Sequence, residues 1–153
     1  MNGGAPITNP AATVRVFRIL KIAFLVYTVL LLFIVIRIPS KSHRPVDQTL
    51  EMAITIVALA TLAMGFVSPR LLAKFARPSS QSAPAAIPIK RWFTGGVIGL
   101  AFLEACSLFG LSLHFLGADL QHSASLVGAG IVAIVFFSPG ALPRNEDGNS
   151  TQN

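Results

Sequence analysis

The stretch GLAFLEACSLFGLSLHFLG, residues 99–117, decides the fold class because it is nearly all apolar and almost long enough by itself to cross a bilayer. A transmembrane helix needs about 20 such residues. Its one acidic residue, Glu104, lies near the middle, where a charge costs at least about 2.5 to 3.5 kcal/mol. We therefore expect Glu104 to be neutral and to face the interior of a helix bundle, as a functional residue or as a structural hydrogen-bonding group.

Three more apolar runs complete the pattern. The predicted spans are residues 16–38, 48–67, 92–116 and 120–138. Only 12% of the residues are charged, whereas about a quarter are charged in soluble domains. Because the runs do not alternate as barrel strands do, and lipid demands an internally bonded backbone, the runs predict helices. The sequence thus predicts an all-α integral membrane four-helix bundle with antiparallel spans.

The segments outside the spans are polar or rich in proline. Residues 1–12 are predicted to be a disordered tail, residues 13–144 the single membrane domain and residues 145–153 a polar tail. Residues 78–88 form a Pro/Ser/Ala linker within the domain. Asp47 is expected to cap the second span at its N-terminus.

A short basic segment follows the second span. Arg70, Lys74 and Arg77 recur at helical spacing after Ser68 and Pro69. One interpretation is a separate surface helix, with Pro69 at its first position, whose basic side chains contact anionic lipid headgroups. The other is a second span that simply continues beyond the membrane.

Basic residues also predict the orientation. Nine of the twelve Lys and Arg residues lie on the side of the two termini and of the second loop. The positive-inside rule then places both termini in the cytoplasm, with the chain in the inner (plasma) membrane. The lipid bilayer and its anionic cytoplasmic headgroups are the expected partners, and no nucleic-acid-binding motif is present.

A helical wheel divides the third span into two faces. Glu104 and Ser107 share one face, and small residues lie on the other. Small residues four apart let helix backbones approach closely, within one chain or in a homo-oligomer or complex with a membrane partner. We expect contacts within the chain. The helix-packing candidates are Gly95, Gly99, Cys106 and Gly110.

The sequence offers little for catalysis. It has no nucleophile elbow, phosphate loop or HExxH motif, so we predict no catalytic residues and no cofactor. His114 and His122, with Asp119 between them, lack the ligand spacing of a metal site and are expected to be solvated. The single cysteine excludes a disulfide within the chain. An enzyme is the least favoured class.

Two resemblances involve the third span. FLEACSLFGLSLHFLG followed by a fourth run ending FFSPGALPR resembles uncharacterised small four-helix bacterial inner-membrane proteins, which implies the fold but no activity. Residues 104–111, EACSLFGL, are similar to the carboxylate helix of rotary-ATPase proteolipids. That resemblance implies that Glu104 carries a proton or a sodium ion. The second span departs from that family because it has only one glycine, Gly65.

Two functional hypotheses follow. The favoured one is a structural or interaction component of the membrane, in which Glu104 is a neutral hydrogen-bonding group. Its expected partner is Ser107, or Thr55 and Thr61 of the second span. The alternative is a small transporter or a proton- or cation-handling subunit that uses Glu104 together with Ser107.

Overall fold

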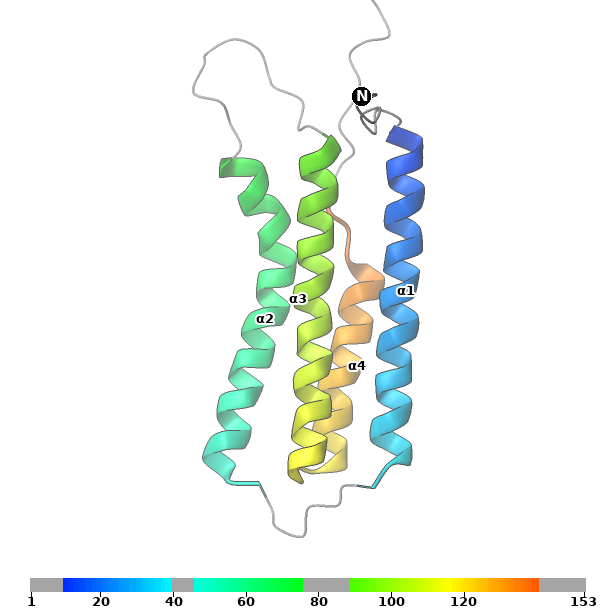
Figure 1. Cartoon of the computed structure of the whole chain (residues 1–153). Coiled ribbons are helices and arrows are strands. Elements are labelled where there is room, and N and C mark those ends of the chain that lie inside the picture. Colours follow the sequence, from blue (N-terminus) through cyan, green and yellow to red (C-terminus); the bar gives the residue numbers. More distant parts are fainter. Residues whose placement is uncertain (1–9, 40–45, 76–88, 141–153) are drawn as a thin grey trace, which may run out of the picture.

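The computed structural model describes residues 10–39, 46–75 and 89–140, in which four helices run side by side (Figure 1). The helices are α1 (Pro10–Arg37), α2 (Gln48–Phe75), α3 (Ile89–Leu116) and α4 (Leu120–Phe136). The predicted all-α bundle is confirmed. Helices α1, α2 and α3 are each long and apolar enough to cross a membrane, and α4 is a shorter apolar helix.

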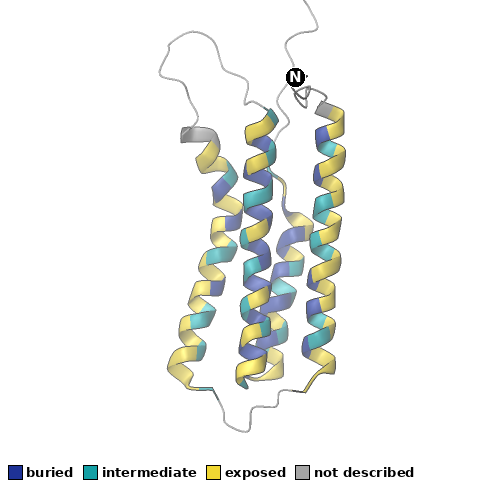
Figure 2. Ribbon diagram, in the orientation of Figure 1, coloured by how far each residue is buried: buried dark blue, intermediate teal, exposed yellow. Residues whose placement is uncertain are grey.

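Helix α3 is the centre of the bundle. Half of its apolar stretch is buried inside the protein, against 17% in α1 and 11% in α2. It packs against all three other helices, whereas α1 and α2 make no contact with each other in the described residues. Figure 2 shows the consequence, since buried residues concentrate on α3 and α4 while the outer faces of α1 and α2 are exposed.

Two helices extend beyond their predicted spans. Helix α1 begins at Pro10, inside the predicted N-terminal tail, and proline is well suited to a first helical position because its missing N–H is not needed there. Helix α2 continues through Pro69 to Phe75, and its last turns bend away from α3 (Figure 1). The continuous second helix is therefore confirmed, and the separate surface helix starting at Pro69 is wrong. Arg77 and the linker 78–88 lie outside the described residues.

The turn between α3 and α4 follows from its sequence. Gly117 has a φ of 97°, which glycine adopts without strain. The Ala118 N–H donates to the Leu113 carbonyl at 3.0 Å, as in a Schellman motif that ends a helix. Asp119 then caps α4, accepting from the Gln121 N–H at 3.1 Å. These caps fix α3 and α4 as antiparallel neighbours.

Helix α4 ends at Phe136, two residues before the predicted limit, and side chains of other helices support the chain beyond it. The Lys21 ammonium donates to the carbonyls of Val135 and Phe137, at 2.9 Å each. The Trp92 indole donates to the Gly140 carbonyl at 3.3 Å. Non-helical backbone at membrane depth requires such partners. Lys21 thus caps α4, and Trp92 is 9% exposed within the bundle.

Candidate functional site

The buried carboxyl of α3 meets α1. Glu104 is 6% exposed and Thr28 is fully buried, and Glu104 Oε2 lies 2.5 Å from the Thr28 hydroxyl oxygen. The prediction that Glu104 faces the bundle interior is confirmed. Its predicted hydrogen-bond partners are wrong, because the first helix and not the second supplies the partner.

The contacts of the Thr28 hydroxyl indicate the protonation state of Glu104. The Thr28 hydroxyl oxygen also lies 2.8 Å from the Phe24 carbonyl oxygen, which can only accept. One hydroxyl has one proton to donate, so both contacts are hydrogen bonds together only when Glu104 is protonated. Glu104 then donates to Thr28, and Thr28 donates to Phe24. The geometry therefore suits the neutral carboxylic acid expected from the sequence.

The other predicted partners are engaged elsewhere. Thr61 donates to the Ala58 carbonyl, and Thr55 contacts α4. Ser107 is fully buried with its hydroxyl against Gly130 of α4, where an added Cβ would collide with it. Within the described residues, Ser107 Oγ and Glu104 Oε1 have no hydrogen-bond partner. Ser107 is thus a close packing residue of the α3–α4 contact and is not bonded to Glu104.

The small residues of α3 pack against two neighbouring helices, α2 and α4. A Cβ built on Gly99 would lie 2.9 Å from the Gly65 carbonyl oxygen of α2 and would also collide with Phe137. A Cβ on Gly95 would be in ordinary contact with Pro69 of α2, at 3.4 Å. On Gly110 it would lie 2.9 Å from the Ser123 carbonyl oxygen of α4. The predicted contacts within the chain are confirmed for these glycines.

Cys106 packs between the same two neighbours. It is fully buried, lies in a cluster with Ala58 of α2, and donates weakly to the Leu126 carbonyl of α4 at 3.8 Å. The small-residue face of α3 is therefore divided between α2 and α4.

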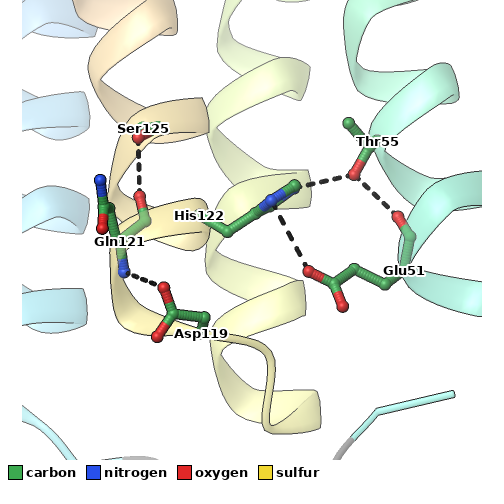
Figure 3. A network of polar contacts seen from close by, with 6 residues as sticks. All are labelled: Glu51, Thr55, Asp119, Gln121, His122 and Ser125. Carbon is green, nitrogen blue, oxygen red and sulfur yellow. Dashed lines mark hydrogen bonds and ion pairs between the residues drawn. The ribbon is translucent and has the colours of Figure 1, made fainter. Parts of the chain in front are cut away.

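A second polar group joins the first turns of α2 to the first turn of α4 (Figure 3). His122 of α4 points toward α2, and its Nε2 lies 3.0 Å from the Thr55 hydroxyl oxygen. Its Nδ1 lies 3.6 Å from Glu51 Oε1. Beside it, Asp119 and Ser125 bond to the backbone of Gln121. His122 keeps 38% of its side chain exposed, so the expected contact with solvent is retained, and it also connects two helices.

The order of hydroxyl, imidazole and carboxylate is that of an activated nucleophile, but the hydrogen bonds run the other way. Thr55 lies 2.7 Å from the Glu51 carbonyl oxygen and donates to it, so His122 Nε2 must donate to Thr55. A ring nitrogen that donates cannot accept the hydroxyl proton as a general base. The group therefore acts as a bond between α2 and α4, two helices that otherwise touch sparsely.

His114, expected to be solvated, is instead buried. It is 3% exposed, and its Nε2 donates to the Ile38 carbonyl at the end of α1, at 2.6 Å. Among the described residues, no group of three or more His, Cys, Asp or Glu could hold a metal ion.

Charge is divided between the two ends of the bundle. The N-terminal ends of α1 and α3 and the C-terminal end of α2 lie at one end, which contains the described basic residues Arg15, Arg18, Arg70, Lys90 and Arg91. Arg70 is exposed there, as a headgroup contact requires, and Lys74 belongs to the last turns of α2. The other end contains Asp47, Glu51 and Asp119 together with one described basic residue, Arg37. Asp47 accepts from the Thr49 N–H at 2.8 Å, so its predicted cap is confirmed.

The fold and these sites define a membrane protein built as a helical bundle. Comparison with protein-family models, with curated proteins and with solved structures finds no match to this chain. The resemblances to small four-helix bacterial membrane proteins and to the proteolipid carboxylate helix stay predictions.

Proposed function

We propose that this protein is a multi-pass inner-membrane protein with a structural or interaction role, in which Glu104 bonds α1 to α3 and carries no ion. One observation supports this proposal above the others: the Glu104 carboxyl is closed inside the bundle against Thr28. Neither residue lines the hollow beside Arg37 and Asp119, the one beside His122 or the small one beside Phe93. An ion carrier needs a route from its carboxyl to water.

The exterior of the bundle suits lateral association in the membrane. Large apolar side chains cover the outer faces of α1 and α2, among them Ile19, Ile22, Met52, Ile56 and Leu59. These faces contact lipid in the free protein and remain available to a second copy or to a membrane partner. Several polar side chains, by contrast, bond within the chain, among them Thr28, Thr55 and His122.

Both termini are proposed to be cytoplasmic. The bundle brings the basic flanks of α1, α2 and α3 to one end, and such residues favour the cytoplasmic side. Reporter fusions that are active only in the periplasm test this. A fusion after Asn153 should be inactive and one in the turn at Gly117 should be active. The opposite result would reverse the orientation.

A second candidate function is proton handling by Glu104. The observation that favours it is the pair of contacts of Thr28, which suit a protonated Glu104 carboxyl, and the Oε1 of that carboxyl has no partner among the described residues. Intramembrane acids commonly mark proton pathways.

One experiment separates the two functions. Wild-type protein and the Glu104→Gln variant are reconstituted in liposomes that contain a pH-sensitive dye, and proton uptake is driven by a potassium gradient with valinomycin. The structural proposal predicts uptake equal to that of empty liposomes for both proteins. Wild-type uptake above this level that Glu104→Gln abolishes, with the variant still folded, would overturn it in favour of proton handling.

A further inference from the structure

A hollow of about 410 Å³ opens at the acidic end of the bundle, between the C-terminus of α1 and the turn that joins α3 to α4. Its wall is partly apolar, formed by Val35, Ala118 and Leu120, and two residues of opposite charge, Arg37 and Asp119, also line it. The volume is within the range of small-molecule sites. None of the residues that define the Glu104 pair belongs to it.

The two charged residues do not neutralise each other. No ion pair joins Arg37 and Asp119 in the described residues, although both line the same hollow. The Arg37 guanidinium lies 5.2 Å from the ring centroid of Phe33, a contact that leaves its N–H donors available. Asp119 uses Oδ2 to cap α4, so Oδ1 can accept from another group. The hollow therefore presents an anion-binding and a cation-binding group side by side.

The end of α1 strengthens the cation-binding part. The C-terminus of a helix carries a partial negative charge that favours cations. His114 donates to the Ile38 carbonyl and fixes the end of α1 against α3. Asp119 and the C-terminal end of α1 therefore suit a cation that has N–H donors.

We propose that this hollow binds the headgroup of a zwitterionic phospholipid with a primary ammonium, of the phosphatidylethanolamine type. Arg37 binds the phosphate, as guanidinium groups do. The ammonium donates to Asp119, whose Oδ1 is not used by the helix cap. The acyl chains follow the exposed apolar face of α1, where Phe33 and Ile36 lie next to Arg37. A choline headgroup fits less well because a quaternary ammonium has no N–H.

The inference rests on the protein lying in a bilayer, and on neither the orientation nor the role of Glu104. Its test uses lipid binding and no ion flux. Failure of this proposal and failure of the proposed function are therefore distinguishable.

The test is native mass spectrometry of the full chain in detergent, titrated with phosphatidylethanolamine, phosphatidylcholine or phosphatidylglycerol of identical acyl chains. The wild type should bind the ethanolamine lipid about tenfold more tightly than the choline lipid, because charge-assisted hydrogen bonds differ between them. Asp119→Asn should abolish that preference, since asparagine still caps a helix but lacks the charge. Arg37→Gln should weaken all three lipids about equally.

Matched controls lie outside the hollow. Asp47→Asn changes the acid that caps α2 at the same end, and Arg18→Gln removes an arginine at the other end. Both should bind lipid as the wild type does. If Asp119→Asn melts at a lower temperature than Asp47→Asn, Asp119→Ser, which also caps helices, replaces it.

Three results would overturn the proposal: equal affinity for ethanolamine and choline lipids, an ethanolamine preference that survives Asp119→Asn, or a control variant that loses the preference equally. Soluble glycerophosphoethanolamine is tested in parallel. If it binds and the lipid does not, the ligand is a water-soluble phosphoamine and the lipid assignment is wrong.

Discussion

Replacing Thr28 by valine tests the interior bond directly. Valine has nearly the shape of threonine and lacks the hydroxyl, so the packing of α1 against α3 is kept while Glu104 loses the partner that lies 2.5 Å away. The carboxyl stays 6% exposed and has no other side chain bonded to it in the described residues. The substitution therefore leaves a buried polar group unsatisfied.

The size of the effect follows from two contributions. A hydrogen bond between helices in a membrane contributes about 0.6 kcal/mol on average and about 1.7 at most. Leaving a buried group unsatisfied costs about 1 to 3 kcal/mol. We expect Thr28→Val to lower the free energy of unfolding by about 1 to 3 kcal/mol. Glu104→Gln should cost less than about 1 kcal/mol, because its amide can still donate to Thr28.

The double variant carries the sharpest expectation. Replacing both partners by apolar groups of similar shape can be nearly neutral. Thr28→Val combined with Glu104→Leu should therefore be more stable than Thr28→Val alone, with a coupling energy of about 1 kcal/mol or more. The assay is reversible unfolding in mixed detergent micelles with increasing sodium dodecyl sulfate. A Thr28→Val variant as stable as the wild type, or strictly additive effects in the double variant, would refute the reasoning.

Other contacts give three more expectations. Gly99→Leu should lower the unfolding free energy by at least about 1 to 3 kcal/mol because a side chain there meets the Gly65 backbone. Gly128→Leu is the matched control, since no atom lies within 4 Å of its added Cβ. Equal melting temperatures of the two variants would contradict the close packing at Gly99. Lys21→Met should speed amide exchange at the end of α4, since two carbonyls lose their donor; unchanged exchange there would mean that Lys21 is not the cap. His122→Ala should speed amide exchange in the first turns of α2 and leave the C-terminal end of α4 unaffected. Exchange in the first turns of α2 that is as slow as in the wild type would argue against the α2–α4 bond.

The fold was predictable because each of its determinants is local. A long apolar run predicts a helix in lipid, and Asp47 and Asp119 cap helices from positions that can be read in the chain. Gly117 between two apolar runs predicts the turn. The small residues of α3 predict close approach, although a helical wheel gives only the direction of a face and not the helix that occupies it. For that reason the division of this face between α2 and α4 could not be read from the sequence.

The hydrogen-bond partners of the polar groups also depend on which helices pack together. Thr28 lies in the long apolar run of the first span, 76 positions before Glu104, and nothing local distinguishes it from Thr55 or Thr61. Lys21 looks like any basic residue that flanks a span, because its role depends on where α4 ends. Glu51 and His122 are 71 positions apart by their numbering and become neighbours only when α2 and α4 share one end of the bundle.

The bilayer gives these few bonds their importance. Lipid chains are as apolar as the helix surfaces, so no hydrophobic force holds helices together, and close packing and hydrogen bonds must do so. In this bundle, single polar contacts join particular pairs of segments. Thr28 and Glu104 join α1 to α3, Lys21 joins α1 to α4, and Thr55 and His122 join α2 to α4. Glu104, in the middle of apolar α3, and Lys21 of α1 therefore have the same structural role. Each bonds its own helix to a neighbouring segment. Ion handling by Glu104 would require more than its burial, namely a route for protons to water, and the liposome experiment measures that route directly.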